Sequence, residues 1–131
     1  MSSYLIGKNV YNTWFLLKIT YGLLFLLAGI DKYFNLITNW EKFVSPEVLY
    51  IFQLNVKQVN FGVGIIEIII GTLILLGFTR IGGYLGAIWL LIITVNFLSM
   101  GQIYLDIAIR DTVMAVGALA LARLTTVKNL I

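Results

Sequence analysis

The residues best suited to chemistry are charged side chains set into otherwise apolar sequence. Asp106, Arg110 and Asp111 stand in a segment with the character of a hydrophobic helix, and Glu67 interrupts another apolar run near its middle. A charge at the centre of a membrane-spanning helix costs ~2.5–3.5 kcal/mol, so such residues must be paired, wetted or functional. Two further charged residues, Asp31 and Lys32, stand at the end of the first apolar run. The predicted cluster of buried charges comprises Asp31, Lys32, Glu67, Asp106, Arg110 and Asp111.

The composition identifies the class of protein. Of 131 residues 60% are hydrophobic and 11% are charged, whereas about a quarter of the residues in soluble domains are charged. Cysteine and histidine are absent, so disulfides, thiolates, imidazole catalysis and the usual metal and haem ligands are excluded. We therefore assign no catalytic residue, no metal site and no covalently bound cofactor. The net charge of +3 is dispersed, which sets nucleic-acid binding aside.

The apolar segments predict an all-α integral membrane protein in contact with the lipid bilayer. Residues 81–105 contain no charge and exceed the roughly 20 residues that a helix needs to cross the hydrocarbon core. Short second and third connections make successive helices antiparallel neighbours. The expected fold is a single domain, residues 1–131, containing an antiparallel four-helix bundle. Its spans are predicted at about 13–35, 58–78, 81–100 and 103–124.

A short helix is predicted between the first two spans. Ser45 is a suitable N-cap, Pro46 suits the first helical position, and Glu47 faces the positive end of the helix dipole. The segment is either a helix in the membrane interface or a plain connector. A tight turn is expected at Thr79-Arg80 and another at 100–102.

The glycines predict close contacts between helices. Glycine lets the backbones of membrane helices approach, and none of these glycines fits a phosphate-binding fingerprint. The positions are Gly62, Gly64, Gly71, Gly77, Gly82, Gly86 and Gly117, the last accompanied by Ala118 and Ala122.

The depth of the charges predicts a pairing. Counted at ~1.5 Å per residue from one face of the membrane, Glu67 lies about 13 Å deep and Arg110 about 10 Å deep. Both charges need a partner, and a single contact between the Arg110 guanidinium and the Glu67 carboxylate would provide it. Two interpretations stay open: the cluster ties helices together, or its surplus carboxylates titrate and bind a polar head group beside an aromatic-lined cavity, as quinone chemistry requires.

An even number of spans places both termini on one side of the membrane. That side carries more positive charge than the other, and the positive-inside rule then makes the termini cytoplasmic. The basic residues of the terminal side are Lys8, Lys18, Arg80, Arg123 and Lys128, against Lys32, Lys42 and Lys57 opposite.

Three segments resemble the DoxX family of small bacterial membrane proteins. They are 22–32, with Ala28-Gly29 before Lys32, then 67–80 beginning at Glu67, and 106–121 with the Arg110-Asp111 pair. The resemblance covers residues 13–124. It implies a four-helix fold in the bacterial cytoplasmic (inner) membrane.

The resemblance also implies a function. Some relatives are subunits of quinone-linked oxidoreductase complexes, so we expect a membrane subunit whose charge cluster lies near a quinone or another lipophilic ligand. The lack of cysteine and of a second domain argues against thiosulfate chemistry by this chain alone. The alternatives are a non-catalytic accessory or assembly subunit of a larger membrane complex, and a small-solute or proton carrier. A protein partner is expected, and a homo-oligomer is a further alternative.

Overall fold

The computed structural model describes residues 2–131, and all the regular secondary structure in that range is helical. The predicted all-α class is confirmed. Five α-helices and two 3-10 turns follow one another: α1 (Ser3–Asp31), η1 (Trp40–Phe43), α2 (Pro46–Phe52), α3 (Val56–Leu75), α4 (Thr79–Ser99), η2 (Gln102–Tyr104) and α5 (Leu105–Leu130).

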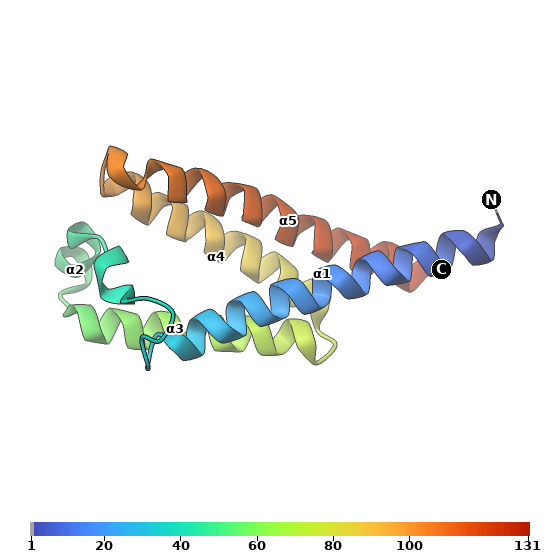
Figure 1. Cartoon of the computed structure of the whole chain (residues 1–131), viewed down its shortest axis with the longest axis horizontal. Helices are drawn as coiled ribbons and strands as arrows, with labels where there is room; N and C mark the ends of the chain where they lie inside the picture. The colour runs from blue at the N-terminus through green and yellow to red at the C-terminus, as the bar shows by residue number, and fades with distance from the viewer. Residues whose placement is uncertain (1) are drawn as a thin grey trace.

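The long helices alternate in direction and lie in two pairs that are farther apart at the end near α2, as Figure 1 shows. α1 packs mainly against α3, and α4 mainly against α5, with smaller contacts joining the two pairs. Both termini lie at one end of the molecule, and α2 with η1 lies at the other (Figure 1). The placement of both termini at one end is what an even number of spans requires, and the side of the membrane that they face stays a prediction.

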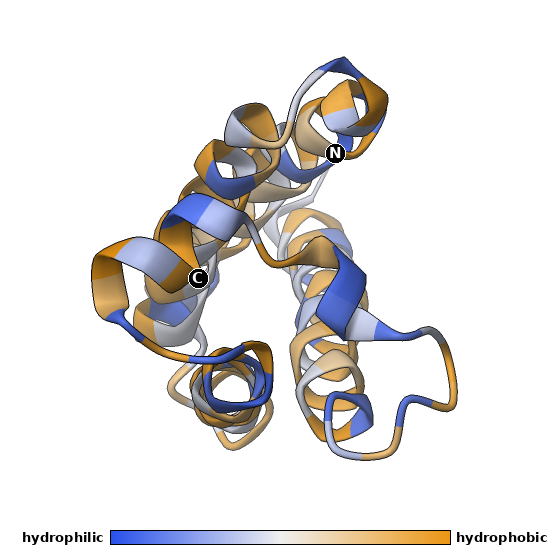
Figure 2. Ribbon diagram, turned by 90° about the vertical axis from the view of Figure 1, so that its left-hand side faces the viewer, coloured by the Kyte–Doolittle hydropathy of each residue, from blue (hydrophilic) through white to orange (hydrophobic). Residues whose placement is uncertain are grey.

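Three of the helices, α1, α3 and α4, are long and apolar enough to cross a membrane. Even in α4 only 39% of the most apolar stretch is buried, and hydrophobic ribbon predominates along the long helices in Figure 2. The chain is therefore a membrane protein whose helices contact lipid. α5 is long enough but less apolar, because it carries Asp106, Arg110, Asp111, Arg123 and Lys128.

Two of the long helices extend beyond the predicted spans. α1 begins at Ser3 rather than near residue 13, and α5 continues to Leu130 rather than ending near 124. Ser2 caps α1 by accepting a backbone hydrogen bond at 3.3 Å, and no proline interrupts the helix. α1 ends at Asp31 instead of 35, shortly before Asn35 takes a positive φ of 53°.

The turn between α3 and α4 lies earlier than predicted. It is formed around Gly77, whose φ of 107° suits glycine, and Thr79 is already the first residue of α4. The buried Thr79 hydroxyl donates a hydrogen bond of 2.8 Å to the Ile74 carbonyl and so caps the end of α3. The predicted turn at 100–102 is confirmed, with Gly101 at φ 103°.

A seam of four glycines joins α1 to α3. A Cβ on Gly29 would lie 2.8 Å from the carbonyl oxygen of Gly64, and one on Gly71 would lie 2.8 Å from that of Gly22. Only hydrogen fits in these places, so the two backbones touch directly. Close packing is confirmed for Gly64 and Gly71, whereas Gly62 and Gly77 face open space.

Small residues also bring the other helices together. Gly82 of α4 lies against Ile74, Gly86 lies against the Phe25 ring, and Gly117 of α5 lies against Tyr21. Each would place a Cβ too close to its neighbour. Ala118 and Ala122 are fully buried in the contact between α4 and α5. The packing role predicted for these positions is confirmed.

The connection from α1 to α3 folds over the end of the bundle. Ser45 caps α2 as predicted, and its backbone N–H donates to the Asn96 side chain at 3.0 Å. Asn96 in turn donates to the Phe43 carbonyl at 2.8 Å. The Phe43 ring meets the Phe97 ring edge-on with 5.7 Å between centroids. The short helix is therefore attached to α4.

We predict that Gly29→Ala weakens the contact between α1 and α3. The new methyl group would meet the Gly64 carbonyl and the Glu67 Cβ, an overpacking that costs about 1–3 kcal/mol. The matched control is Gly62→Ala, which faces open space and should be neutral or stabilising by roughly 0.5–1 kcal/mol. Thermal unfolding followed by circular dichroism in detergent compares the two, and equal melting temperatures would contradict the seam.

We predict that acid loosens the connection at α2. A hydrogen bond from the Ser45 hydroxyl to its carboxylate holds the pKa of Glu47 below its ordinary value. A lowered pKa means that the ionised carboxylate favours the folded connection above the ordinary pKa, and that this contribution is lost as pH falls through the folded-state pKa. Hydrogen exchange of the α2 amides, corrected for intrinsic rate, should rise at acid pH in the wild type. Glu47→Gln should remove that pH dependence, while Glu41→Gln should retain it.

Candidate functional site

The candidate site is a buried ion pair between α1 and α3. The Lys32 Nζ lies 2.6 Å from the Glu67 Oε2, and the two side chains are 7% and 6% exposed. Among residues 2–131 this contact is the single ion pair. Few charged side chains of the described residues are buried, so the Lys32–Glu67 pair is the main charged contact in the interior of the protein.

The glycine seam places the two side chains together. Glu67 stands one turn after Gly64, and its Cβ lies against the backbone of Gly29. Lys32 follows the last residue of α1, and its side chain runs back along the helix until Nζ lies 3.5 Å from the Ala28 carbonyl. A cation at a helix C-terminus is also favoured by the helix dipole.

The η1 segment closes the site from outside. Trp40 lies across Lys32, with Nζ 3.9 Å from the centroid of the ring. Asp31 holds this tryptophan in place by accepting a 2.8 Å hydrogen bond from its indole N–H. Asp31 also accepts the backbone N–H groups of Leu36 and Ile37 at 2.8 and 2.9 Å. Its charge therefore organises the loop rather than the ion pair.

A second tryptophan connects the ion pair to the outside of the bundle. The Trp89 indole N–H, on α4, donates to the Glu67 Oε1 at 3.4 Å. Trp89 also lines an open apolar groove of about 250 Å³ between α3 and α4. The other residues that line the groove are Ile66, Ile69, Ile70, Leu85, Ile88 and Ile92. The Trp89 side chain thus separates the buried Glu67 carboxylate from a groove that faces lipid.

The predicted pairing of Arg110 with Glu67 is wrong. Glu67 binds Lys32, whereas Arg110 and Asp106 are exposed on α5. Neighbouring residues of a helix point about 100° apart, and it is Asp111 that faces inward. Asp111 is buried. The structure therefore buries four of the six predicted residues and leaves Asp106 and Arg110 outside.

Sequence reasoning missed both tryptophans and the main role of Lys32. The sequence predicts Lys32 as a member of the cluster at the end of the first apolar run, and gives it no pairing with Glu67. The available signal was the length of its side chain, which carries the ammonium group back by about one helical turn. Trp40 and Trp89 had no signal of comparable strength, because tryptophan is common wherever membrane helices end or pack.

The site can hold a proton or a polar ligand atom, but it has no ligand set for a metal. Residues 2–131 contain no group of three or more Asp or Glu side chains that could hold a metal ion. The groups available for chemistry are a carboxylate, an ammonium group and the Trp89 indole N–H in an apolar surrounding, because the Trp40 indole N–H is bonded to Asp31. Such a site favours neutral, hydrogen-bonding molecules over anions or cations.

Comparisons of the chain with models of protein families, with curated proteins and with solved structures found no match. The function is therefore inferred from the geometry of this site.

We predict that Lys32 and Glu67 are strongly coupled. Lys32→Met or Glu67→Gln alone leaves one charged partner buried, at a cost of about 3–5 kcal/mol, whereas the double variant leaves none. A double-mutant cycle on unfolding free energy in detergent should therefore show the double variant more stable than the sum of the single effects requires. The matched control is Lys42→Met, at an exposed lysine of η1. Additive effects of the two substitutions would contradict the pairing.

Proposed function

We propose that this chain is a DoxX-like membrane subunit of a quinone-linked oxidoreductase complex. In this proposal α1, α3, α4 and α5 all span the bacterial cytoplasmic membrane, α2 lies in the interface, and a quinone occupies the apolar groove between α3 and α4. The observation that carries the proposal is the Trp89 side chain, which lines that groove and donates to the buried Glu67 carboxylate.

Quinone chemistry fits this arrangement for a physical reason. Reduction or oxidation of the ring moves protons together with electrons, so a quinone site needs a group that can exchange protons next to an apolar surface. The groove supplies isoleucine and leucine side chains for the ring and its tail. Glu67 supplies the carboxylate, one side chain behind the groove wall. A ligand dissolved in the bilayer can enter the groove directly because it faces lipid.

Electrons must come from elsewhere in this scheme. The chain has no cysteine or histidine to hold a redox metal or cluster. A partner subunit would supply the electron donor or acceptor, and this chain would contribute the quinone site and the proton-exchanging carboxylate. That division requires a stable complex with another membrane protein.

The distribution of charge supports the proposed orientation. The end with both termini carries Lys8, Lys18, Arg80, Arg123 and Lys128, and it has no acidic residue. Basic residues are retained on the cytoplasmic side of membrane proteins. The termini therefore face the cytoplasm, and α2 with the ion pair lies towards the opposite side.

A second candidate function is that of a non-catalytic accessory or assembly subunit. It is favoured by Asp106 and Arg110, which are exposed in the first two turns of α5. A charge that faces lipid is costly, and a partner helix of complementary charge would remove that cost. In this alternative the Lys32–Glu67 pair only ties α1 to α3. Normal quinone-dependent activity of the complex with Ile88→Phe, and loss of complex assembly with Arg110→Leu, would favour it.

We predict that the wild-type protein, extracted gently from its membrane, carries quinone. Ile88→Phe places a ring in the groove and should lower the bound quinone about tenfold or more, because the added volume competes with the ligand. Val113→Phe adds the same ring on the exposed face of α5 and serves as the matched control. Solvent extraction and chromatography measure quinone per protein. Wild-type protein without quinone, or equal loss in both variants, would contradict the proposed site.

A further inference from the structure

Two cations share one tryptophan at the end of the molecule that carries the termini. The Nζ of Lys128 lies 4.0 Å from the Trp14 ring centroid, and that of Lys18 lies 4.9 Å from it. The indole itself is buried, and its N–H donates to the Thr125 hydroxyl at 2.9 Å. Because the ring is held between α1 and α5, it also fixes the two ammonium groups.

No Asp or Glu side chain of the neighbouring segments offsets this positive charge. Residues 1–30 and 112–131 contain no Asp or Glu, and the one ion pair in residues 2–131 lies in the half of the molecule nearer α2. The indole ring attracts the cations but cannot neutralise them. Two ammonium groups held against one ring at the edge of a low-dielectric region favour binding of an anion.

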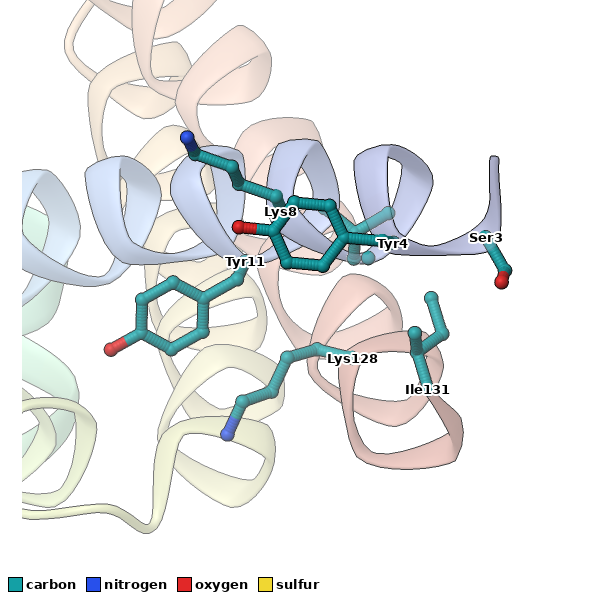
Figure 3. A pocket seen from close by; sticks show the side chains of 8 residues that line it. Ser3, Tyr4, Lys8, Tyr11, Lys128 and Ile131 are labelled. Carbon is teal, nitrogen blue, oxygen red and sulfur yellow. The ribbon is translucent and has the colours of Figure 1, made fainter. Parts of the chain in front are cut away.

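An open groove of about 470 Å³ is lined by Lys128, one of these two cations. It runs between the start of α1 and the end of α5, and Figure 3 shows Tyr4 and Tyr11 along α1 with Lys128 reaching from α5 to the side of Tyr11. Lys8 borders the same groove from α1, with its ammonium group directed away from Lys128 in Figure 3. Ammonium and phenol groups are hydrogen-bond donors suited to phosphate oxygens.

The groove lies at the level of lipid headgroups. Counted back from Asp31 at the opposite face, about 20 residues of α1 cross the ~30 Å hydrocarbon core and reach Tyr11. Tyrosine and tryptophan are enriched at this level. Exposed apolar side chains continue from the groove towards the hydrocarbon, with Phe15 48% and Leu16 65% exposed. They offer a surface for acyl chains next to a site for the headgroup.

We propose that this groove binds the phosphate group of an anionic phospholipid. Lys128, held by Trp14, would contact the phosphate oxygens from within the groove, and the Tyr11 hydroxyl would donate to them. Lys18, on the same ring, would add positive charge beside the site. A free phosphate ion shares this chemistry, but it would leave the adjoining apolar surface unused. The inference depends on membrane insertion and is independent of quinone binding at the groove between α3 and α4.

Native mass spectrometry of the detergent-solubilised full chain tests the proposal. Phosphatidylglycerol and phosphatidylcholine with the same acyl chains are titrated in turn, and wild-type protein should retain phosphatidylglycerol preferentially. Each lysine near an anionic lipid contributes about a fivefold factor, so Lys18→Gln with Lys128→Gln should reduce the affinity for phosphatidylglycerol roughly 25-fold. The matched control, Lys42→Gln with Lys57→Gln, removes two exposed lysines near the opposite end and should keep the preference.

Three further results decide the proposal. Lys18→Arg with Lys128→Arg keeps both positive charges beside the Trp14 ring, so this variant should prefer phosphatidylglycerol as the wild type does. Circular dichroism checks that every variant is folded. Equal retention of both lipids by wild-type protein, or an unchanged preference in the folded glutamine variant, would overturn the headgroup site. Displacement of phosphatidylglycerol by millimolar inorganic phosphate would overturn the assignment to lipid, and resistance to it would support that assignment.

Discussion

A charged side chain within a membrane needs a partner of opposite charge, and the backbones that carry the two side chains must come close together. The contact between Lys32 and Glu67 meets this requirement. An ammonium group and a carboxylate at 2.6 Å must both be removed from water, so the helices that carry them have to approach closely. Glycine at positions 22, 29, 64 and 71 permits that approach, because no side chain stands between α1 and α3. The ion pair and the seam therefore depend on each other.

The surroundings of the pair follow from this arrangement. Asp31, the last residue of α1, folds the following loop back so that Trp40 covers the ammonium group. On the other side Trp89 reaches the carboxylate from α4 and separates it from the lipid-facing groove. The opposite end of the molecule is different in character, since it contains only basic charges and holds two of them against Trp14. One end of the protein thus contains a buried ion pair, and the other contains basic side chains held against an aromatic ring.

Much of the architecture was readable from the sequence. Apolar run lengths indicated the long helices, the Ser45-Pro46 start located α2, and the spacing of glycines indicated where backbones meet. The ends of the helices were harder to predict, because a helix continues beyond the hydrocarbon when nothing interrupts it. α1, for example, already begins at Ser3. The partner of Glu67 could not be read from depth alone. Depth counting places Cα atoms, whereas the long Lys32 side chain runs back along α1 and Arg110 is rotated to the outside of α5.

The central claim is that Glu67 is bound by the lysine of α1 and not by the arginine of α5. Magnetic-resonance dipolar recoupling in lipid bilayers measures this directly, with ¹³C on glutamate carboxyl carbons and ¹⁵N on either lysine Nζ or arginine side chains. The structure predicts a short contact from lysine nitrogen to a glutamate carboxyl carbon, which disappears in Lys32→Gln and persists in Lys42→Gln. A contact seen with the arginine label, or a lysine contact unchanged in Lys32→Gln, would contradict it.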